Sequence, residues 1–499
     1  MDGSRETVTT RWLIADQLGP HFLDEDVDHV LLIESRHAFV RRRMHRAKAH
    51  LILSAMRHRA AELGDQATLI AAESMAEVLP AWADRLEMVA PTSWGMRTLA
   101  TRHNVPMLPA RGFVTSETDF DEWAERRAGK RLRMEDFYRE VRQRTGILMD
   151  GDEPIGGRWN FDHDNRLPPP RGARTLDLPP VWQPQEDDID AQVRRDLDRW
   201  EAEGAEFIGQ DGPRRFAATR GEALAALEDF VGHRLATFGP YEDAALTDDW
   251  VMAHSLISAP MNLGLLDPLE VVQRVLDAGS AQKVPLSSVE GFVRQVIGWR
   301  DYVWHLYWYL GPDYIDQSNA LDAHAELPDW FANLDSASEV SARCLSVGLG
   351  DVRAYGWTHH IVRLMILGNW ALQHGYDPVA STRWFTDAFV DGHEWVMAAN
   401  VVGMALHADG GRMATKPYAA GGAYIKRMTD FCGGCAYRPD VRVGDRACPV
   451  TAGYWAFLDR HRERFARHPR MAQPVRGLER LVDREQLVEA EERRGSGAP

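Results

Sequence analysis

Residues 288–310 read SVEGFVRQVIGWRDYVWHLYWYL, and apolar side chains recur along them every three to four positions, as in a buried helix. Residues 221–238 (GEALAALEDFVGHRLATF) and 357–375 (WTHHIVRLMILGNWALQHG) repeat that pattern. From residue 221 to residue 475 the sequence is almost wholly of this kind. We therefore predict an all-α domain over residues 221–475.

Upstream of this helical stretch, short apolar runs alternate with helical patterns. The runs are RWLIAD (11–16), HVLLIES (29–35), ATLIAAE (67–73) and RLEMVAP (85–91). Short apolar strands separated by helices indicate a parallel sheet covered on both faces. We predict a Rossmann-like α/β domain over residues 1–145, although it has no GxGxxG fingerprint. A ligand of this domain is expected at the carboxyl ends of the strands, near Asp16, Gln17, Leu18 and Glu34.

The stretches on either side of the helical domain are polar. Residues 146–220 are expected to form a long ordered connector, because RLPPPRGARTLDLPPVWQPQEDD within them is too rich in proline and charge for a helix or strand. Residues 476–499 end in EAEERRGSGAP. They are expected to fray as a charged tail.

Composition and charge exclude several classes of protein. No run among the 499 residues reaches the ~18 apolar residues of a membrane span, and the start MDGSRETVTTRW is not a signal peptide, so we expect a cytoplasmic protein. The formal net charge of −16 argues against general polyanion binding but leaves room for a local basic groove. A basic run, Arg41-Arg42-Arg43 with Arg46 and Lys48, is expected to be a solvated helix face, with phosphate contact as the alternative.

The four cysteines are the clearest chemical signal. Cys432 and Cys435 enclose two glycines, Cys448 follows after twelve further residues, and Cys344 stands alone in a helical stretch. In a reducing compartment such thiols are better interpreted as metal ligands than as disulfides. Four sulfurs suit a tetrahedral zinc ion or a 4Fe-4S cluster, and the spacing leaves these two nearly level. Unliganded core cysteine is the remaining alternative.

Several longer motifs together resemble one family. They are GGRWNFDHDNRLPPP (156–170), HSLIS (254–258), HHIVRLMILGNWAL (359–372) and FCGGCAYRPDVRVGDRACP (431–449). They are similar, in register over about residues 11–471, to motifs of the iron-sulfur bacterial cryptochromes and photolyases, the group that contains the prokaryotic (6-4) photolyases. The resemblance implies a monomer with an antenna-binding α/β domain, a helical domain that holds FAD, and a 4Fe-4S cluster rather than zinc.

The resemblance also assigns cofactor-binding positions in the helical domain. Arg363 and Asp391 match an oppositely charged pair beside the isoalloxazine ring, where a guanidinium polarises the flavin. Asn369 follows Arg363 on the same helix. The segment that cradles the FAD pyrophosphate corresponds to His254, Ser255, Leu256, Ile257 and Ser258. Each assignment has a structural alternative: a capped helix start for this segment, an ordinary ion pair for Arg363 and Asp391, and a core amide for Asn369.

A substrate pocket and an antenna pocket are implied in the same way. His359 and His360 stand at the His-His pair of the (6-4) enzymes, with His360 expected to face the lesion and transfer a proton. Tyr418 and Tyr424 match further pocket residues. Without the family, these four would be interpreted as structural or core residues. Asp16, Gln17, Leu18 and Glu34 match the pocket of the antenna 6,7-dimethyl-8-ribityllumazine.

Three positions depart from the family pattern. Met397 stands opposite flavin N5, where glutamate or asparagine is usual, and a thioether cannot donate a hydrogen bond to N5. Ser336 replaces a tryptophan of the electron route, whereas Trp384 is retained. Trp357 stands where tyrosine is usual. Redox tuning and substrate shape are therefore expected to differ from those of the family.

These inferences lead to one preferred function and two alternatives. The preferred one is light-driven, FAD-dependent repair of (6-4) dipyrimidine photoproducts by electron transfer, that is, a DNA photolyase (a carbon-carbon lyase) whose partner is UV-damaged DNA. The first alternative is a cryptochrome-like photoreceptor that does not repair DNA. The second is a repurposed flavin and iron-sulfur redox enzyme that acts on a small molecule.

Overall fold

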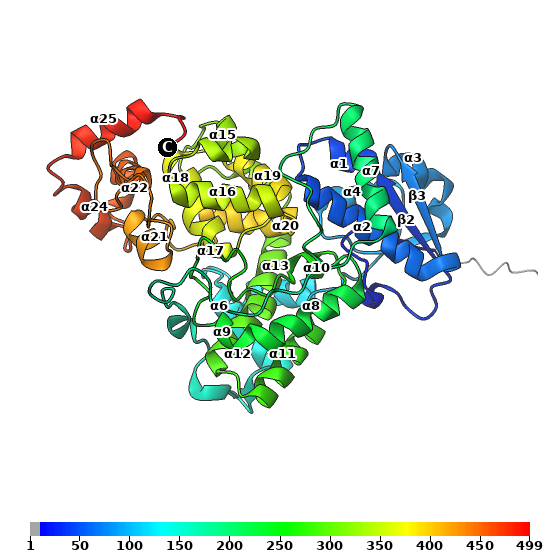
Figure 1. The fold of residues 1–499 in the computed structure, drawn as a ribbon. Helices are drawn as coiled ribbons and strands as arrows, with labels where there is room; N and C mark the ends of the chain where they lie inside the picture. The colour runs from blue at the N-terminus through cyan, green and yellow to red at the C-terminus, as the bar shows by residue number, and fades with distance from the viewer. Residues whose placement is uncertain (1–9) are drawn as a thin grey trace, which may run out of the picture.

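The computed structural model describes residues 10–499, apart from the side chains of residues 83 and 336–338. Residues 1–9 of the predicted 1–145 domain lie outside the described residues. The α/β part and the helical part lie side by side, with the C-terminal segment beyond the helical part (Figure 1). Over the described chain, no helix is both long and apolar enough to cross a membrane.

The N-terminal part is built on a five-stranded parallel sheet in the order β3-β2-β1-β4-β5, which confirms the predicted α/β domain. Its fifth strand was not predicted, because two residues carry no periodicity. Helix α2, the long basic helix of the sequence, buries Leu51, Leu53 and Ala55 completely. The bounds are β1 (Thr10–Leu13), β2 (His29–Ser35), β3 (Ala67–Ala72), β4 (Leu86–Val89), β5 (Met107–Leu108), α1 (Arg36–Val40), α2 (Arg46–Leu63), α3 (Met75–Val78), α4 (Trp94–Arg102), α5 (Glu117–Arg126) and α6 (Met134–Thr145).

The connector is largely irregular, as predicted, but it contains one long helix. A two-residue hairpin, β6 (Met149–Asp150) with β7 (Glu153–Pro154), opens it. Helix α7 (Asp188–Ala202) closes it and packs on α2 (Figure 1). A capping box formed by Asp187 and Asp190 starts α7, and Val193, Leu197 and Trp200 are buried along one face. This apolar stripe was hidden in the sequence by the surrounding charges.

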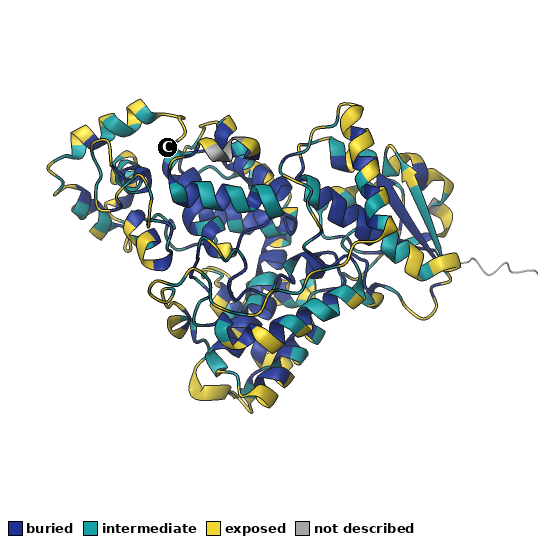
Figure 2. Cartoon of the chain, viewed as in Figure 1, coloured by how far each residue is buried: buried dark blue, intermediate teal, exposed yellow. Residues whose placement is uncertain are grey.

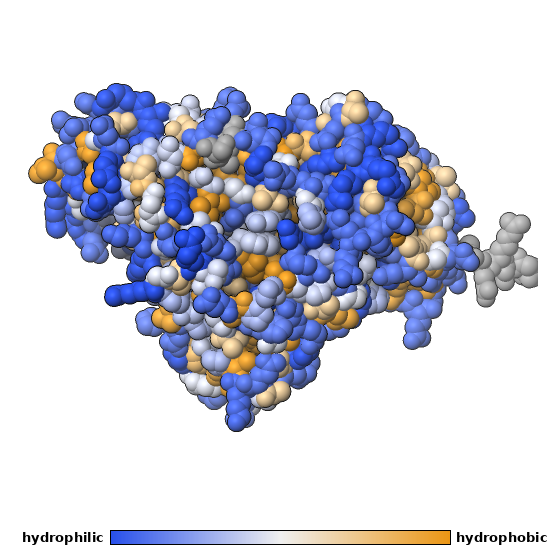
Figure 3. Space-filling model, viewed as in Figure 1, coloured by the Kyte–Doolittle hydropathy of each residue, from blue (hydrophilic) through white to orange (hydrophobic). Residues whose placement is uncertain are grey.

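The remaining chain is mostly helical, and the inward-facing sides of its helices are buried (Figure 2). Hydrophilic residues cover most of the face drawn in Figure 3, with small apolar patches between them. The bounds are α8 (Arg220–His233), α9 (Leu235–Phe238), α10 (Ser258–Asn262), α11 (Pro268–Gln282), α12 (Leu286–Val293), α13 (Asp301–Leu310), α14 (Tyr314–Gln317), α15 (Asp329–Ala332), α16 (Arg343–Tyr355), α17 (His360–Val362), α18 (Asn369–His374), α19 (Pro378–Ala388), α20 (Glu394–Met397), α21 (Gly422–Met428), α22 (Pro449–Arg460), α23 (Arg462–Phe465), α24 (Ala472–Leu478) and α25 (Arg484–Arg494).

Three helices of this part contain π-helical segments, Arg294–Arg300, Arg363–Gly368 and Ala398–Ala405. Two of these segments pack against each other so closely that a Cβ on Gly368 would lie 2.9 Å from the Cβ of Ala405. A π-helical turn widens the helix and is found mostly at functional sites. The helical period of the sequence predicted the helices but not this widening.

The C-terminal segment is docked. Helix α25 packs on α22 and buries Leu487. Beyond it, the carbonyl oxygen of Pro499 accepts hydrogen bonds from the backbone N–H groups of Ser341 (2.6 Å) and Ala342 (3.0 Å), which precede α16. The expectation that residues 476–499 fray is therefore wrong, because their backbone and apolar groups find partners on the helical part.

Candidate functional site

Arg363 and Asp391 form a buried, bidentate ion pair. Arg363 opens a π-helical segment, and Asp391 lies in the turn between α19 and α20. The guanidinium donates to the two carboxylate oxygens at 2.8 and 3.1 Å, and Ser258 Oγ donates to Asp391 at 2.6 Å. Burial raises the pKa of Asp391, but Arg363 and Ser258 outweigh burial and hold it below its usual value. The expected pairing is thus present, and Ser258 belongs to it.

Aromatic rings enclose the Arg363 guanidinium. Its central carbon lies 4.2 Å from the ring centroid of Phe389 and 5.5 Å from that of Trp357. Trp357 is buried, and its indole N–H has no hydrogen-bond partner in the described chain. An unpaired buried donor costs free energy unless a bound group accepts its hydrogen. The rings therefore exclude water from the ion pair on one side and leave a donor for a ligand.

Three histidines converge beside this pair, and we call His254, His359 and His360 the histidine cluster. The rings of His254 and His359 stack with centroids 4.7 Å apart, and the ring of His360 lies 5.5 Å from that of His254. Both ring nitrogens of His359 and Nε2 of His254 are buried without a hydrogen-bond partner among the described residues. Burial first, and then neighbouring cations, lower the pKa of both rings, so they are neutral at pH 7.

His360 has a different environment from the other two. Its side chain is 48% exposed, and its Nε2 lies 3.2 Å from a carboxylate oxygen of Asp243. The surrounding protein lowers the pKa of His360, but the hydrogen bond and charge of Asp243, with that of Glu242, outweigh this effect and raise it. Burial raises the pKa of Glu242 to about 7. His360 is therefore a solvent-facing imidazole whose protonated form is favoured by its acidic neighbours.

The two predicted pocket tyrosines, Tyr418 and Tyr424, are both half-buried. Burial raises the pKa of Tyr424, and the charge of the Asp243 carboxylate, the partner of His360, raises it further. Burial also raises the pKa of Tyr418, against the opposing charge of Arg166. Sequence reasoning missed Asp243, which belongs to no quoted motif, and Arg166, which lies within the motif of residues 156–170 but was given no role there.

The other predicted flavin-side residues are buried in the fold, except Ser255, which is half-buried. Leu256 adopts a φ of 55°, in the left-handed region, just before α10 begins. Asn369 is fully buried, and its amide is engaged by the backbone of Ala420 (2.8 and 3.1 Å) and by Gln373 (3.0 Å). This geometry favours the core interpretation of Asn369. Met397 is buried at the end of α20. Ser255 and Ile257 complete the turn before α10.

The four cysteines line one small cavity. Cys344 lies in the first turn of α16, Cys432 and Cys435 follow α21, and Cys448 precedes α22. Burial, and then the neighbouring thiols, raise the pKa of Cys344 well above its usual value and that of Cys432 to about 11. Cys344 and Cys448 are buried, and Cys432 and Cys435 are half-buried. Four clustered sulfurs that repel one another as thiolates form a site suited to a metal centre, whose positive charge would reverse these shifts. The structure brings all four together.

At the carboxyl end of the sheet, the residues predicted to contact an antenna molecule differ in whether their side-chain oxygens have hydrogen-bond partners. The hydroxyl of Thr92 donates to Asp16 Oδ2, and burial raises the pKa of Asp16. Asp16 Oδ1 and Gln17 Oε1 are buried without a partner in the described chain, while Gln17 Nε2 donates to Val89 O at 2.9 Å. The backbone N–H of Leu18 donates to Leu263 O, which links this edge to the helical part.

Both side-chain oxygens of Glu34, in contrast, are paired. Arg57 donates to its two carboxylate oxygens at 2.8 and 2.9 Å and also lies 2.8 Å from Asp196 on α7. The carboxylate of Glu34 is therefore committed to a buried ion pair that joins the sheet to α7. This pairing argues against the expectation that Glu34 contacts an antenna molecule, and the sequence could not reveal it because Arg57 and Asp196 lie far along the chain.

The basic run is not a solvated helix face. Lys48 is 4% exposed. Arg42 lies 3.0 Å from Asp387, and Arg46 contacts Asp198, Glu201 and Asp211. Arg43 pairs with Glu206 at the surface. The interpretation from sequence is corrected in this respect, because the charges that neutralise the run come from the connector and from the end of α19.

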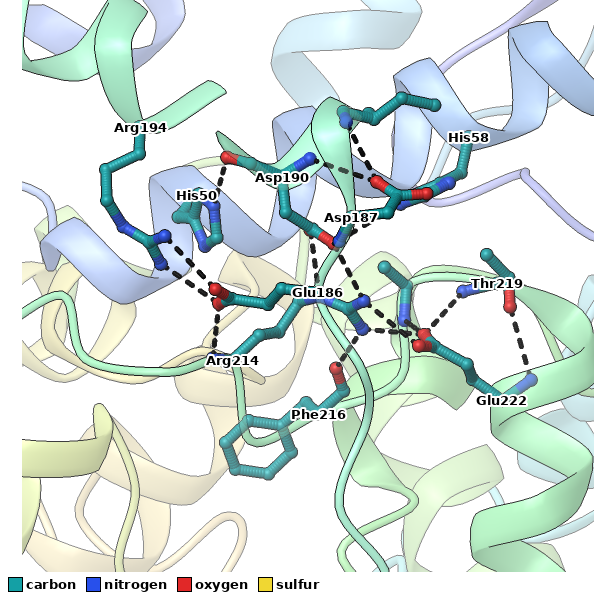
Figure 4. Close-up of polar contacts among 12 residues, drawn as sticks. His50, His58, Glu186, Asp187, Asp190, Arg194, Arg214, Phe216, Thr219 and Glu222 are labelled. Carbon is teal, nitrogen blue, oxygen red and sulfur yellow. Dashed lines mark hydrogen bonds and ion pairs between the residues drawn. The ribbon is translucent and has the colours of Figure 1, made fainter. Parts of the chain in front are cut away.

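A second cluster of charged side chains joins α2, α7 and α8, and we call it the Arg214 network (Figure 4). All five N–H donors of Arg214 are used: Nε and Nη2 reach Asp190 (3.0 and 3.1 Å), both Nη atoms reach Glu222 (2.6 and 3.0 Å), and Nη1 also reaches Phe216 O (3.0 Å). His58 Nε2 lies 3.6 Å from Asp190. Because Arg214 occupies both oxygens of Asp190, this cluster is no metal site.

Comparison with known proteins places the chain. A sequence model of the family "Deoxyribodipyrimidine photo-lyase-related protein" matches residues 11–210. A (6-4) photolyase of Agrobacterium fabrum is 38% identical over 496 residues, which cover 94% of this chain and 95% of that protein. A bacterial class III photolyase from Agrobacterium tumefaciens shares the fold with a TM-score of 0.57 at 15% identity, over 86% of this chain and 88% of that one.

A cryptochrome of Synechocystis sp. PCC6803 gives a TM-score of 0.54 at 12% identity, over 97% of this chain and 98% of that one. At these identities the two solved structures show the fold alone. The parallel sheet followed by a helical part is thus a photolyase and cryptochrome architecture, as the motifs predicted. Together with the relative that is similar over nearly the whole length, these observations establish that the chain belongs to the family of deoxyribodipyrimidine photo-lyase-related proteins.

Proposed function

We propose that this protein repairs (6-4) dipyrimidine photoproducts in DNA by light-driven, FAD-dependent electron transfer. The observation that carries the proposal is the pair His360–Asp243, a half-exposed histidine whose protonated form a carboxylate favours, next to the buried Arg363–Asp391 ion pair. The 38% identical relative is named a (6-4) photolyase, and this name agrees with the proposed substrate.

The residues around Arg363 fit a bound flavin. A large polar cofactor needs hydrogen-bond partners in a dry site. The unpaired nitrogens of His254, His359 and Trp357 supply such partners, and the Arg363–Asp391 pair supplies fixed charge. When bound and reduced, FAD supplies the electron that light sends to the lesion and that returns at the end. Asn369 and Met397 act as core residues behind this site rather than as its polar contacts.

His360 would act as the proton donor. As an imidazolium it carries a proton that can pass to an oxygen of the lesion and return, and Asp243 stabilises the charged form through the 3.2 Å contact. Tyr424 and Tyr418 would line the pocket that receives the flipped-out bases, since a damaged pair cannot reach a buried site within the base stack. Arg166 and Arg427, close to these tyrosines, would meet phosphate despite the acidic net charge.

The two further groups follow from the same proposal. Cys344, Cys432, Cys435 and Cys448 would hold a 4Fe-4S cluster, which joins α16 to the segment around α21 and α22. Asp16 Oδ1 and Gln17 Oε1 would accept hydrogen bonds from a 6,7-dimethyl-8-ribityllumazine antenna, without Glu34. Trp384 remains for electron supply to the flavin. The side chain of Ser336, the other position of that route, lies outside the described residues.

An absorption spectrum combined with a repair assay tests the proposal. Purified protein is expected to show flavin bands over broad iron-sulfur absorbance, and light is expected to restore a (6-4) oligonucleotide. Equal binding to damaged and undamaged duplex, with no repair, would instead support the photoreceptor, and turnover of a small molecule without DNA binding would support the redox enzyme. Either result overturns the repair assignment.

Removal of one cysteine tests the cluster separately. Cys344→Ser deletes one of four ligands, so iron content and the broad visible absorbance are expected to fall to background, with a loss of several kcal/mol in the free energy of unfolding, on the order of metal-dependent folding energies. Iron analysis and urea unfolding measure both effects. Stoichiometric zinc in the wild-type protein, with no iron, would contradict the iron-sulfur assignment.

A further inference from the structure

Lys48 lies where the α/β part meets the turn that carries Asp391. It belongs to the first turn of α2, and its amine donates to the backbone carbonyls of Thr386 (2.7 Å) and Gly392 (2.5 Å). These carbonyls lie on either side of Asp391. Thr386 is among the last residues of α19, whose terminal carbonyls have no partner within the helix. A cation at this end of a helix is favoured by the helix dipole.

The turn held by Lys48 is unusually tight. A Cβ on Gly392 would lie 2.5 Å from Thr386 O and 2.9 Å from Phe389 O, so only glycine fits. Several other bonds attach this turn to its surroundings: His45 N donates to Asp387 O at 2.9 Å, and Val390 N donates to Gly356 O at 2.8 Å. Lys48 is the member of this set that binds both ends of the turn.

The charges around Lys48 keep it cationic at neutral pH. Burial lowers its pKa to about 8, and the carboxylates of Asp387 and Asp391 oppose that effect. Among the 46 salt bridges of the described residues none involves Lys48, so the ammonium is held by carbonyl oxygens and by the field of these acids rather than by a contact ion pair. A buried charge costs free energy unless hydrogen bonds and nearby opposite charges offset the loss of hydration. For Lys48 the two carbonyls and the two acids provide that compensation.

We propose that Lys48 is a positioning residue: from the α/β part, it holds the turn of residues 386–392 so that Asp391 meets Arg363 and Ser258 in the flavin site. The inference rests on the proposed function for its meaning, but its geometry does not depend on repair. Loss of the amine leaves two buried carbonyls unpaired and frees the turn, which lets Asp391 move relative to Arg363. The charge at the flavin site is thus set in part by the antenna-binding half of the chain.

The test compares Lys48→Met with Arg43→Ala. Arg43 belongs to the same basic run but pairs with Glu206 at the surface, so it is a matched control for loss of charge. In the flavin-loaded protein, Lys48→Met is expected to lower hydrogen-exchange protection of residues 386–392 by about tenfold or more, in keeping with loss of two charge-assisted hydrogen bonds. The flavin absorption bands and midpoint potential are expected to shift, with partial rescue in Lys48→Arg. Arg43→Ala is expected to match wild type in all three measurements.

Two outcomes would overturn the proposal. One is a Lys48→Met protein that equals Arg43→Ala in exchange, absorption and potential. The other is a change in exchange alone, with an unaltered flavin, which would make Lys48 a purely structural residue. If Lys48→Met does not fold, Lys48→Gln, which keeps an amide donor without the charge, is judged on the same comparison. Failure of (6-4) repair in the wild-type protein would count against the proposed function but would leave these measurements unaffected.

Discussion

The Arg214 network and the histidine cluster are both groups of titratable side chains, but they differ in how completely their polar atoms are paired. Arg214 is 2% exposed, and each of its five donors meets an acceptor (Figure 4). In the histidine cluster, three buried ring nitrogens of His254 and His359 meet none within the described residues. We call the Arg214 network closed, because every donor of its central guanidinium is paired although His58 Nε2 at its edge is not, and we call the histidine cluster open.

This difference distinguishes a cluster that stabilises the fold from a cluster that can bind a ligand. Folding favours complete pairing of buried polar atoms, because each unpaired one costs about 1–3 kcal/mol. A closed cluster, such as the Arg214 network, stabilises the junction between α7, which packs on α2, and the start of α8. An open cluster gains stability from a bound group that pairs its atoms. Residue type alone, which is all that a motif carries, does not distinguish these two cases.

The largest expected effect lies in the closed cluster. Arg214→Met leaves the carboxylates of Asp190 and Glu222 buried without their cation, so the free energy of unfolding is expected to fall by about 3–5 kcal/mol. Urea unfolding measures the change. Arg215→Ala, next in sequence, is the control and should stay within about 0.5 kcal/mol, because the Arg215 side chain donates to the exposed Gln183 and lies over the Tyr355 ring. Flavin absorption of the remaining folded protein is expected to be unchanged, and a loss of flavin would break the separation between the clusters.

The next effect is on activity and lies in the open cluster. His360→Asn removes the proton donor, and the repair rate under light is expected to fall about 100-fold or more. Because the side chain is 48% exposed, the free energy of unfolding should change by only about 0.5 kcal/mol. His233→Asn, a histidine with a similar exposure that pairs with Asp229, serves as the control and should repair normally. Equal repair by the two variants would show that His360 does not act on the lesion.

A smaller effect concerns pH. The pKa of His360 is raised chiefly because Asp243 outweighs the effect of burial. Since the protonated ring is the donor, repair is expected to decline as pH rises through that pKa. Asp243→Asn removes the carboxylate, so the decline should begin at lower pH, by about one pH unit, which corresponds to ~1.4 kcal/mol of differential interaction. Repair rates from pH 5.5 to 9 measure the midpoint, and an unmoved midpoint would exclude Asp243 as the partner.

The smallest effect is again in the closed cluster. The pKa of His58 is raised because its Nε2 lies 3.6 Å from the carboxylate of Asp190, against the opposing effect of burial. A raised pKa contributes stability that is complete below the unfolded value near 6.5 and is lost as pH rises through the folded value. Wild-type protein is thus expected to lose up to about 1 kcal/mol over this window relative to His58→Gln. Thermal unfolding at pH 5.5 and 8 compares the two proteins, and parallel pH profiles would contradict the role of His58.

Part of the site could be found from sequence. The spacing of Cys432 and Cys435 by itself indicated metal ligands, whereas the pair His359–His360 and the segment before Ser258 were found through the family motifs that contain them. What could not be found depends on contacts between distant residues. His360 meets Asp243 across 117 positions, and Arg57 takes Glu34 away from the antenna pocket. Asp243 carried no signal of its own, since an acid beside apolar residues is common on any surface.

The sequence by itself determined the order of elements: a parallel sheet from short apolar runs, helices from a period of 3.6 residues, and a four-cysteine centre from thiol spacing. These features depend on local geometry, which neighbouring residues specify. Only the tertiary structure decided which polar groups are paired and which stay open. Lys48 shows why, because its run resembled a solvated helix face until α19, 338 residues later in the chain, placed the Thr386 carbonyl against its amine. Burial and pairing depend on what the rest of the chain brings to a residue, and no local pattern contains that information.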